Sequence, residues 1–270
     1  MNQKNHSTVP ADVKDGLTPA GAPALDISGR VATITLDKPS YANRLSPEDL
    51  GTIRRHIQAV NEAEDVLVLR IMATGKYFCS GYDISALAAD DAPSSLYFGE
   101  TVDMLEAARP VTIAAIHGGV YGGGTDLCLA CDFRIGTPQA NMFMPAVRLG
   151  LHFYPGGMVR YVTRLGLDNA KRLFLTAEKI DAATMLQLGF LTELAQEGDL
   201  DARVQALSAQ LAGMAPIALT GIKRHLNLIA RGQLDIADIE SLVLRSERSS
   251  DIAEGARAWK EKREPIFIGG

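Results

Sequence analysis

The sequence contains no long hydrophobic run, few cysteines and no stretch rich in basic residues, and each of these features excludes a class of protein. No apolar run reaches the ~18 residues that a membrane-spanning helix requires. Three cysteines in 270 residues are too few for a secreted disulfide framework. The net charge of -5, with no basic stripe, argues against a nucleic-acid-binding surface. We therefore expect neither a membrane nor a nucleic acid as a partner.

The cysteines also give no sign of a metal or redox site. Cys128 and Cys131 form a Cys-x-x-Cys pair, but they lie in an apolar run and no second pair of ligands is nearby. Thiols in such surroundings usually pack as small hydrophobic side chains. We predict buried cysteines and no metal ligands.

The N-terminal segment, residues 1–22, is polar and contains two prolines, with Pro23 directly after it. It lacks the apolar centre of a signal peptide. We expect residues 1–22 to form a disordered leader and the protein to be cytoplasmic.

The rest of the chain alternates apolar strands, glycine-containing turns and helical segments, which is typical of an α/β fold. Residues 66–73 and Val111–Ile116 are almost wholly apolar, as expected for strands that are buried on both faces of a parallel sheet. Turns that contain glycine follow them, at residues 75–83 and 118–124. The hydrophobic content of 47% is enough for a sizeable core.

Further elements are predicted from periodicity and from start and stop signals. Ala24–Ser28 and Val31–Leu36 read as a β-hairpin, and Ser46 before Pro47 reads as the start of a helix that continues to about residue 63. The remaining predicted elements are a helix at 93–109, a helix at 125–130, a strand at Phe133–Gly136, and helices at 169–175, 182–188, 200–214, 217–231 and 236–258.

Two glycine turns carry the strongest indication of chemistry. Each of the stretches Ser80-Gly81-Tyr82-Asp83 and Gly122-Gly123-Gly124-Thr125-Asp126 ends on an acidic residue. Two such turns can direct two backbone N–H groups at one point, which stabilises an enolate or a tetrahedral oxyanion. Asp126 follows the second turn and can handle a proton beside that point. The sequence therefore predicts an enzyme.

These turns and several further segments resemble the crotonase (enoyl-CoA hydratase/isomerase) superfamily. The order and spacing of the segments carry the resemblance, which extends from about residue 24 to residue 269. The matching segments are Gly75 to Ile84, Arg109 to Leu127, Cys131 to Phe133, Leu149 to Gly157, Arg164 to Gly166, Leu175 to Ala177, Ala182 to Gly189 and Glu261 to Phe267.

The resemblance implies a fold of stacked ββα turns with a helical C-terminal region, assembled as a homotrimer or a dimer of trimers. It implies that residues 23–200 form the ββα core with the active site, and that residues 201–270 form a helical trimerisation region. Acyl thioesters of coenzyme A are the implied substrates, with no permanently bound cofactor.

The resemblance also implies roles for individual residues. The backbone N–H groups of Tyr82 and Gly123 match the oxyanion hole, and Asp126 matches a catalytic carboxylate. The residues that fall in or beside the coenzyme A site are Lys38, Ala42, Arg44, Asp83, Ile84 and Lys262. The charged residues of this set can equally be read as solvated surface charge.

The sequence departs from the family's hydratases at one position. Those enzymes carry a second glutamate twenty positions after the residue matching Asp126, directly after a proline; here Pro145 is followed by Ala146. Syn-hydration needs one group to activate water and another to protonate carbon. We therefore expect a single acid/base residue and no efficient hydration.

Several reactions remain open. Isomerisation needs one acid/base residue, Asp126, with His152 as a further candidate because imidazole titrates near neutrality. Decarboxylation of a malonyl-type thioester would use Tyr82, Tyr154 and Asp126, by resemblance to methylmalonyl-CoA decarboxylase. Two further hypotheses are a carbon–carbon hydrolase that acts without coenzyme A and a non-catalytic acyl-CoA binder.

Overall fold

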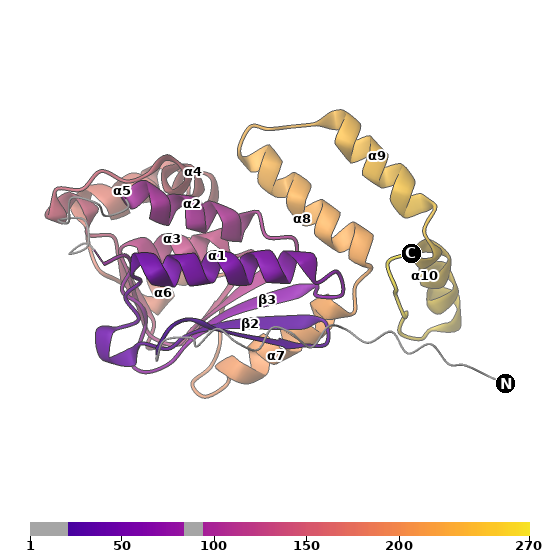
Figure 1. The fold of residues 1–270 in the computed structure, drawn as a ribbon, viewed down its shortest axis with the longest axis horizontal. Helices are drawn as coiled ribbons and strands as arrows, with labels where there is room; N and C mark the ends of the chain where they lie inside the picture. Colours follow the sequence, from indigo (N-terminus) through magenta and orange to yellow (C-terminus); the bar gives the residue numbers. More distant parts are fainter. Residues whose placement is uncertain (1–20, 84–93) are drawn as a thin grey trace.

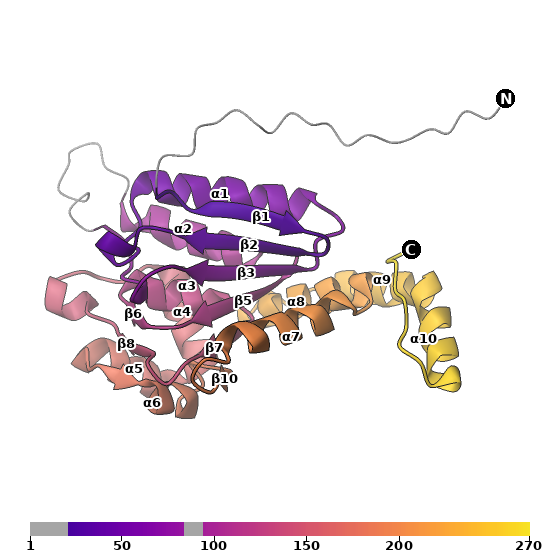
Figure 2. The ribbon, with the colours of Figure 1, turned by 90° about the horizontal axis from the view of Figure 1, so that it is seen from below.

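The computed structural model describes residues 21–83 and 94–270 and has a six-stranded sheet at its centre (Figure 2). The first two strands pair as the predicted antiparallel hairpin, and all other neighbours in this sheet are parallel. In their order across the sheet, the strands are β1 (Ala24–Ser28), β2 (Val31–Leu36), β3 (Val68–Ala73), β5 (Val111–Ile116), β7 (Phe133–Gly136) and β10 (Glu193–Leu194).

A second, four-stranded sheet consists of short strands that periodicity did not predict. These strands are β4 (Tyr77–Cys79), β6 (Gly119–Tyr121), β8 (Asn141–Phe143) and β9 (Ile180–Asp181). Along the chain, β3, β4 and α2 (Ser95–Glu106) form one unit, and β5, β6 and α3 (Gly123–Ala130) form the next. Each unit adds one strand to each sheet and then a helix, which confirms the fold of stacked ββα turns.

The other helices are arranged around these sheets (Figure 1). Ser46 and Asp49 form a capping box at the start of α1, with Pro47 as its first residue, as the sequence predicts. Besides α2 and α3, the helices are α1 (Pro47–Glu62), α4 (Pro155–Leu165), α5 (Leu167–Thr176), α6 (Ala182–Gln187), α7 (Leu200–Ala212), α8 (Pro216–Ala230), α9 (Ile236–Glu247) and α10 (Ser250–Glu261).

One helix was missed by the sequence analysis, and one helix prediction was wrong. Helix α4 was not predicted, because glycines at 156 and 157 weaken the helical signal of its first turn. The helix predicted at 236–258 is two helices, α9 and α10. The Asp251 carboxylate accepts hydrogen bonds from the backbone N–H groups of Ile268 and Gly269, at 2.9 and 3.0 Å, so the first turn of α10 is fixed to the C-terminal segment.

The strands of the large sheet separate two hydrophobic cores. On β5, Val111, Ile113 and Ala115 point into the core that α7 covers, while Ala114 and Ile116 point into the core beneath α1 and α2. Because both faces are buried, this strand is apolar at every position except Thr112, whose hydroxyl donates to Asp132. The predicted boundary at residue 200 falls at the first residue of α7, and α7 packs against β3, β5 and β7.

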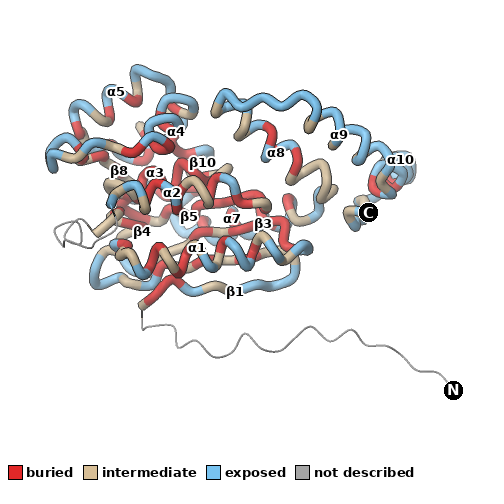
Figure 3. Tube along the Cα trace, turned by 45° about the horizontal axis from the view of Figure 1, so that its top comes forward, coloured by how far each residue is buried: buried red, intermediate tan, exposed pale blue. Residues whose placement is uncertain are grey.

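The C-terminal helices α8, α9 and α10 extend away from the sheets (Figures 1 and 3). Helix α9 has no buried residue, and Trp259 on α10 is 86% exposed. Within residues 21–83 and 94–270, no helix is both long enough and apolar enough to cross a membrane.

Candidate active site

The two glycine turns predicted from the sequence lie directly against each other. Gly81 has φ +89°, and a Cβ atom placed on it would lie 2.7 Å from the Gly123 nitrogen and 2.9 Å from the Tyr121 carbonyl oxygen. Only glycine fits this position, because a side chain would need both an unfavourable backbone conformation and space that the second turn occupies. The turns therefore bring Tyr82 and Gly123 to one place.

The two backbone N–H groups that the sequence predicts as an oxyanion hole, those of Tyr82 and Gly123, lie in regular backbone structure. Tyr82 forms a parallel bridge with Leu45, in which the Leu45 N–H donates to the Gly81 carbonyl and the Asp83 N–H donates to the Leu45 carbonyl. Gly123 is the first residue of α3, where N–H groups have no acceptor within the helix. In the described parts of the chain, no other acceptor receives the Gly123 N–H.

Ala146 lies beside the second turn. It is 7% exposed and begins a 3₁₀ segment (Ala146–Leu149), while the ring of Pro145 lies against Gly122. The position that carries a glutamate in the family's hydratases is thus close to the glycine turn, but a methyl group provides no acid or base.

Asp126 is fully buried and holds three hydrogen bonds. The Tyr154 hydroxyl donates to Oδ2 at 2.7 Å. Arg160 donates from Nε to Oδ1 at 2.8 Å and from Nη2 to Oδ2 at 2.6 Å, which forms a two-bonded ion pair. Such paired contacts fix both the position and the plane of a carboxylate. Tyr154 is the N-cap residue of α4 and Arg160 lies within the same helix, so α4 orients Asp126 from two points.

Arg160 also joins Asp126 to a larger cluster of charges, which we call the ionic network: Asp103, Glu106, Asp126, Arg160, Arg164 and Arg231. Arg160 Nη1 lies 2.5 Å from Asp103 Oδ1 and 3.2 Å from Glu106 Oε2. Arg231, which follows α8, and Arg164 on α4 contact the same glutamate. The network contains three carboxylates and three guanidinium groups, so its charges balance.

The ionic network favours the ionised form of Arg160. Burial opposes the charge of Arg160, but its hydrogen bonds with Asp126 and the nearby negative charges raise its pKa above the ordinary value. Burial and the Asp126 carboxylate raise the pKa of the Tyr154 hydroxyl well above its ordinary value. Tyr154 therefore keeps its proton at neutral pH and donates it toward Asp126.

Sequence reasoning missed Arg160 and the other network members outside α3. Little in the sequence could have identified Arg160, because the helix that contains it was not predicted and its spacing from other residues follows no known pattern. The informative feature was Gly156 and Gly157, which suit a close approach between helices. A Cβ atom at Gly156 would lie 2.2 Å from Asp103 Oδ1, so α4 and α2 are in direct contact there.

Three aromatic rings lie close to one another beside the two glycine turns. Phe98 on α2 is 1% exposed, and its ring lies 5.7 Å from that of Tyr82 and 6.0 Å from that of Tyr154, between centroids. Burial, followed by the nearby Asp83 charge, raises the pKa of the Tyr82 hydroxyl. Tyr82, Phe98 and Tyr154 together form what we call the aromatic wall.

Most of the predicted coenzyme A residues lie around the loop that precedes α1. Ala42 and Asn43 both have φ of 51°, and the Ala42 carbonyl accepts a hydrogen bond from the Ser80 N–H at 3.0 Å. Lys38 Nζ donates to both oxygens of Asp49, at 2.7 and 2.8 Å. This loop is therefore joined to the first glycine turn.

The remaining residues of this predicted group differ in their position and in their exposure. Arg44 lies 3.4 Å from Asp83 and its side chain is 42% exposed, which leaves it accessible. Ile84 lies outside the described residues. Lys262 ends α10, and Figures 1 and 2 place α10 far from the start of α1. One chain therefore does not bring Lys262 to Arg44.

His152 is exposed, and its Nδ1 lies 2.8 Å from the carbonyl oxygen of the next residue. The structure connects Tyr154, but not His152, with Asp126. Cys128 and Cys131 are fully buried as predicted, and Cys79 is fully buried too; burial raises the pKa of the Cys79 and Cys131 thiols to about 12. In the described part of the chain, no group of three His, Cys, Asp or Glu side chains is placed to hold a metal ion.

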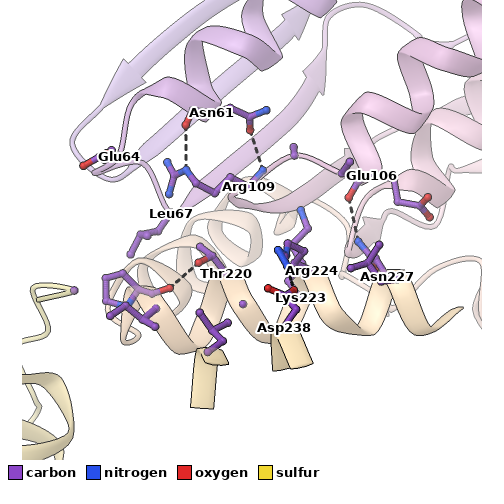
Figure 4. A pocket seen from close by; sticks show the side chains of 18 of the residues that line it. Asn61, Glu64, Leu67, Glu106, Arg109, Thr220, Lys223, Arg224, Asn227 and Asp238 are labelled. Atoms are coloured by element: carbon purple, nitrogen blue, oxygen red, sulfur yellow. Dashed lines mark hydrogen bonds and ion pairs between the residues drawn. The ribbon is translucent and has the colours of Figure 1, made fainter. Parts of the chain in front are cut away.

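A cavity of about 1040 Å³ lies at the opposite edge of the large sheet (Figure 4). Residues that precede β2, β3 and β5 line it together with α8, whereas the glycine turns follow the ends of these strands. Two of its cations bind the chain itself: Arg109 donates to the carbonyls of Ala63 and Val66, and Lys223 donates to that of Pro110. Asp103, Glu106 and Arg231 of the ionic network also line this cavity, whereas Asp126 and the residues of the two glycine turns do not.

Comparisons with known proteins find one family among the similar sequences and structures. The family model described as "Enoyl-CoA hydratase/isomerase" matches residues 26–270. YngF of Bacillus subtilis (strain 168) is 30% identical over 246 residues, which cover 88% of this chain and 95% of YngF. The peroxisomal Delta(3,5)-Delta(2,4)-dienoyl-CoA isomerase of Arabidopsis thaliana is 29% identical over 256 residues, 87% of this chain and 91% of that protein. The crystal structure of enoyl-CoA hydratase from Bacillus anthracis has a TM-score of 0.83 and 27% identity, and covers 92% of this chain and 99% of that one.

Proposed function

Since the chain belongs to the enoyl-CoA hydratase/isomerase family and is an acyl-CoA-processing enzyme, we propose that it stabilises a thioester enolate and moves one proton with Asp126. The observation that carries this proposal is the direct contact between the two glycine turns, with Asp126 one helical turn after Gly123. The carbonyl oxygen of the thioester would accept hydrogen bonds from the N–H groups of Tyr82 and Gly123. Donors fixed in this way stabilise the charge that develops on the enolate oxygen.

Asp126 would carry the proton. An ionised carboxylate has about four lone-pair sites, and Tyr154 and Arg160 occupy three of those on Asp126. The remaining site, on Oδ1, would accept a proton from one carbon of the acyl group and return it to another. One group suffices for such an isomerisation. Because Ala146 provides no second group, we do not expect efficient hydration.

Decarboxylation of a malonyl-type thioester is a second candidate, and the hydrogen bond between Tyr154 and Asp126 favours it. In this reaction, the carbon–carbon bond breaks and carbon dioxide leaves. The electron pair stays on the thioester as an enolate, which then takes up a proton. The Tyr154 hydroxyl, whose pKa is raised, is a protonated donor close to the two turns.

The test is a mass-resolved incubation of the purified protein with 2-enoyl, 3-enoyl, malonyl-type and β-keto thioesters of coenzyme A. We expect an isomerised product or carbon dioxide release, and loss of either in Asp126→Asn. Binding without turnover of any thioester would favour a non-catalytic binder, and no affinity for coenzyme A esters would favour a hydrolase that acts without coenzyme A. Either result would contradict the proposal.

We further propose that the coenzyme A moiety lies along the loop from Lys38 to Arg44. Arg44 is the accessible cation of this loop, since Lys38 is held by Asp49. A guanidinium group forms paired hydrogen bonds with phosphate oxygens. Ala42 and Asn43, both in the left-handed conformation, fix the shape of the loop against the first glycine turn.

Assembly into a trimer or a dimer of trimers is also proposed. Three apolar side chains of α8, those of Ile222, Leu226 and Ile229, are 48–60% exposed. Contiguous exposed apolar surface often marks a protein–protein interface. Light scattering of the purified protein tests the assembly, and a monomeric mass at micromolar concentration would contradict it.

A further inference from the structure

We propose that Phe98 sets the length of the acyl group that the site accepts, and that the preferred substrates are short acyl thioesters. This inference rests on the proposed function, because it takes Tyr82 and Gly123 as the residues that bind the thioester carbonyl. The aromatic side chains next to that carbonyl are the basis for the preferred length.

The ring of Phe98 is in contact with the oxyanion-hole glycine. A Cβ atom at Gly123 would lie 2.7 Å from both Cε1 and Cζ of Phe98, so the ring occupies the space next to the Gly123 Cα. A bound carbonyl oxygen must come within ~3 Å of the Gly123 nitrogen. The first carbons of the acyl group therefore pass close to this ring.

Neighbouring rings hold Phe98 in place. The rings of Tyr82 and Tyr154 both pack against Phe98, which is 1% exposed. The Tyr154 ring is itself fixed, since a Cβ atom at Gly99 would lie 2.6 Å from it and its hydroxyl donates to Asp126. In a close-packed cluster, one ring cannot move away without displacing its neighbours.

The aromatic wall therefore limits the room for additional methylene groups. One methylene that fits or does not fit an apolar pocket changes discrimination by about 10–200-fold. A short acyl group ends before it must displace Phe98, whereas a long one requires the ring to move. We expect affinity to fall as the acyl chain lengthens.

Binding of saturated thioesters tests the inference without requiring turnover. The dissociation constants of butyryl-CoA and decanoyl-CoA are measured for the full-length protein and for Phe98→Ala and Phe98→Leu. We expect wild type to bind butyryl-CoA more tightly, and both substitutions to shift the ratio of the two constants at least about 10-fold toward decanoyl-CoA.

Phe174→Leu is the matched control. Phe174 packs in the same region, with its ring 5.0 Å from that of Phe153 and 4.6 Å from that of Tyr161, but it is not in contact with Gly123. If Phe98→Ala does not fold, Phe98→Leu retains an apolar side chain and gives the same comparison.

An unchanged ratio in a folded Phe98 variant would overturn the inference, and so would an equal shift in Phe174→Leu. These outcomes leave the proposed function intact if the thioesters still bind and react. Failure of wild type to bind any acyl-CoA would instead overturn the proposed function, and the length preference with it.

Discussion

The two ends of the α2 and α4 helix pair are built from different chemistry. Near the start of both helices, Phe98 and Gly99 on α2 meet Tyr154 on α4, and the contacts are aromatic. Further along, Asp103 and Glu106 meet Arg160, and the contacts are ionic. The residue numbers of the contacting pairs increase in the same order on both helices. The helices therefore run in the same direction.

Asp126 lies where these two ends meet. It accepts one hydrogen bond from Tyr154 at the aromatic end and two from Arg160 at the ionic end. The difference between the ends separates two tasks. Rings set the shape of the space beside the glycine turns, and the Arg160 guanidinium fixes the position of the carboxylate.

The largest expected effect comes from removing the carboxylate where the ends meet. Asp126→Asn should lower kcat by about 10²–10⁴-fold, as expected for loss of a general acid/base, with little change in KM. Steady-state kinetics with the best thioester measures it, and Asp168→Asn on the exposed first turn of α5 is the control. A melting temperature that falls while kcat per folded molecule stays constant would assign Asp126 a structural role alone.

Among the variants considered, we expect the one that removes Arg160 from the ionic network to lower the free energy of unfolding most. Arg160→Met leaves three carboxylates without their shared partner, and loss of one member of a buried ion pair costs about 3–5 kcal/mol. Arg172→Met removes an exposed pair with Glu178 and should leave the free energy of unfolding nearly unchanged. Urea unfolding of both variants measures the difference, and equal costs would show that the network contributes no more than a surface pair.

Separating the two glycine turns should affect catalysis more than stability. Gly81→Ala combines a left-handed conformation with contact against the Gly123 nitrogen, so we expect destabilisation of about 1–3 kcal/mol and a loss of at least about 10²-fold in kcat. Gly150→Ala is the matched control, because Gly150 also has positive φ but no atom lies within 4 Å of the position that its Cβ would take. A variant of Gly81 with normal kcat would argue against the oxyanion hole.

Lowering the pH should reduce the free energy of unfolding through Asp103, by a smaller amount than the substitutions above. Burial opposes the charge of Asp103, but hydrogen bonds from Arg160 and Arg231 lower its pKa. A lowered folded-state pKa gives stability that is present above the unfolded value of about 3.9 and is lost as pH falls through the folded value. Since Asp103 is 41% exposed, we expect Asp103→Asn to reduce the loss between about pH 7 and pH 3 by about 1 kcal/mol or less. Identical pH curves would exclude this contribution.

The sequence predicted elements well where one period repeats over several residues. The hairpin of β1 and β2, the buried strand β5 and the capped start of α1 all follow from local patterns. It did not predict strands of two or three residues, because so short a segment has no measurable alternation. Pairing with a neighbouring strand, and not local preference, makes β4, β6 and β8 extended.

For the candidate site, the sequence indicated the residues of the glycine turns and Tyr154, but not Arg160, the other partner of Asp126. Gly81 and Gly123 are recognisable because a tight turn restricts the residue type. Arg160 is not recognisable, because an arginine is compatible with almost any exposed helix position. Its pairing with Asp126 joins residues 34 positions apart, and no local pattern encodes that distance.

By itself, the sequence determined the α/β alternation, the two glycine turns and the absence of an acid at position 146. These properties are local, since they depend on the side chains and backbone freedom of a few consecutive residues. Only the tertiary structure decided that Arg160 fixes Asp126 and that Phe98 lies against Gly123. Both contacts arise from how α2, α3 and α4 pack, and packing is set by the whole core at once.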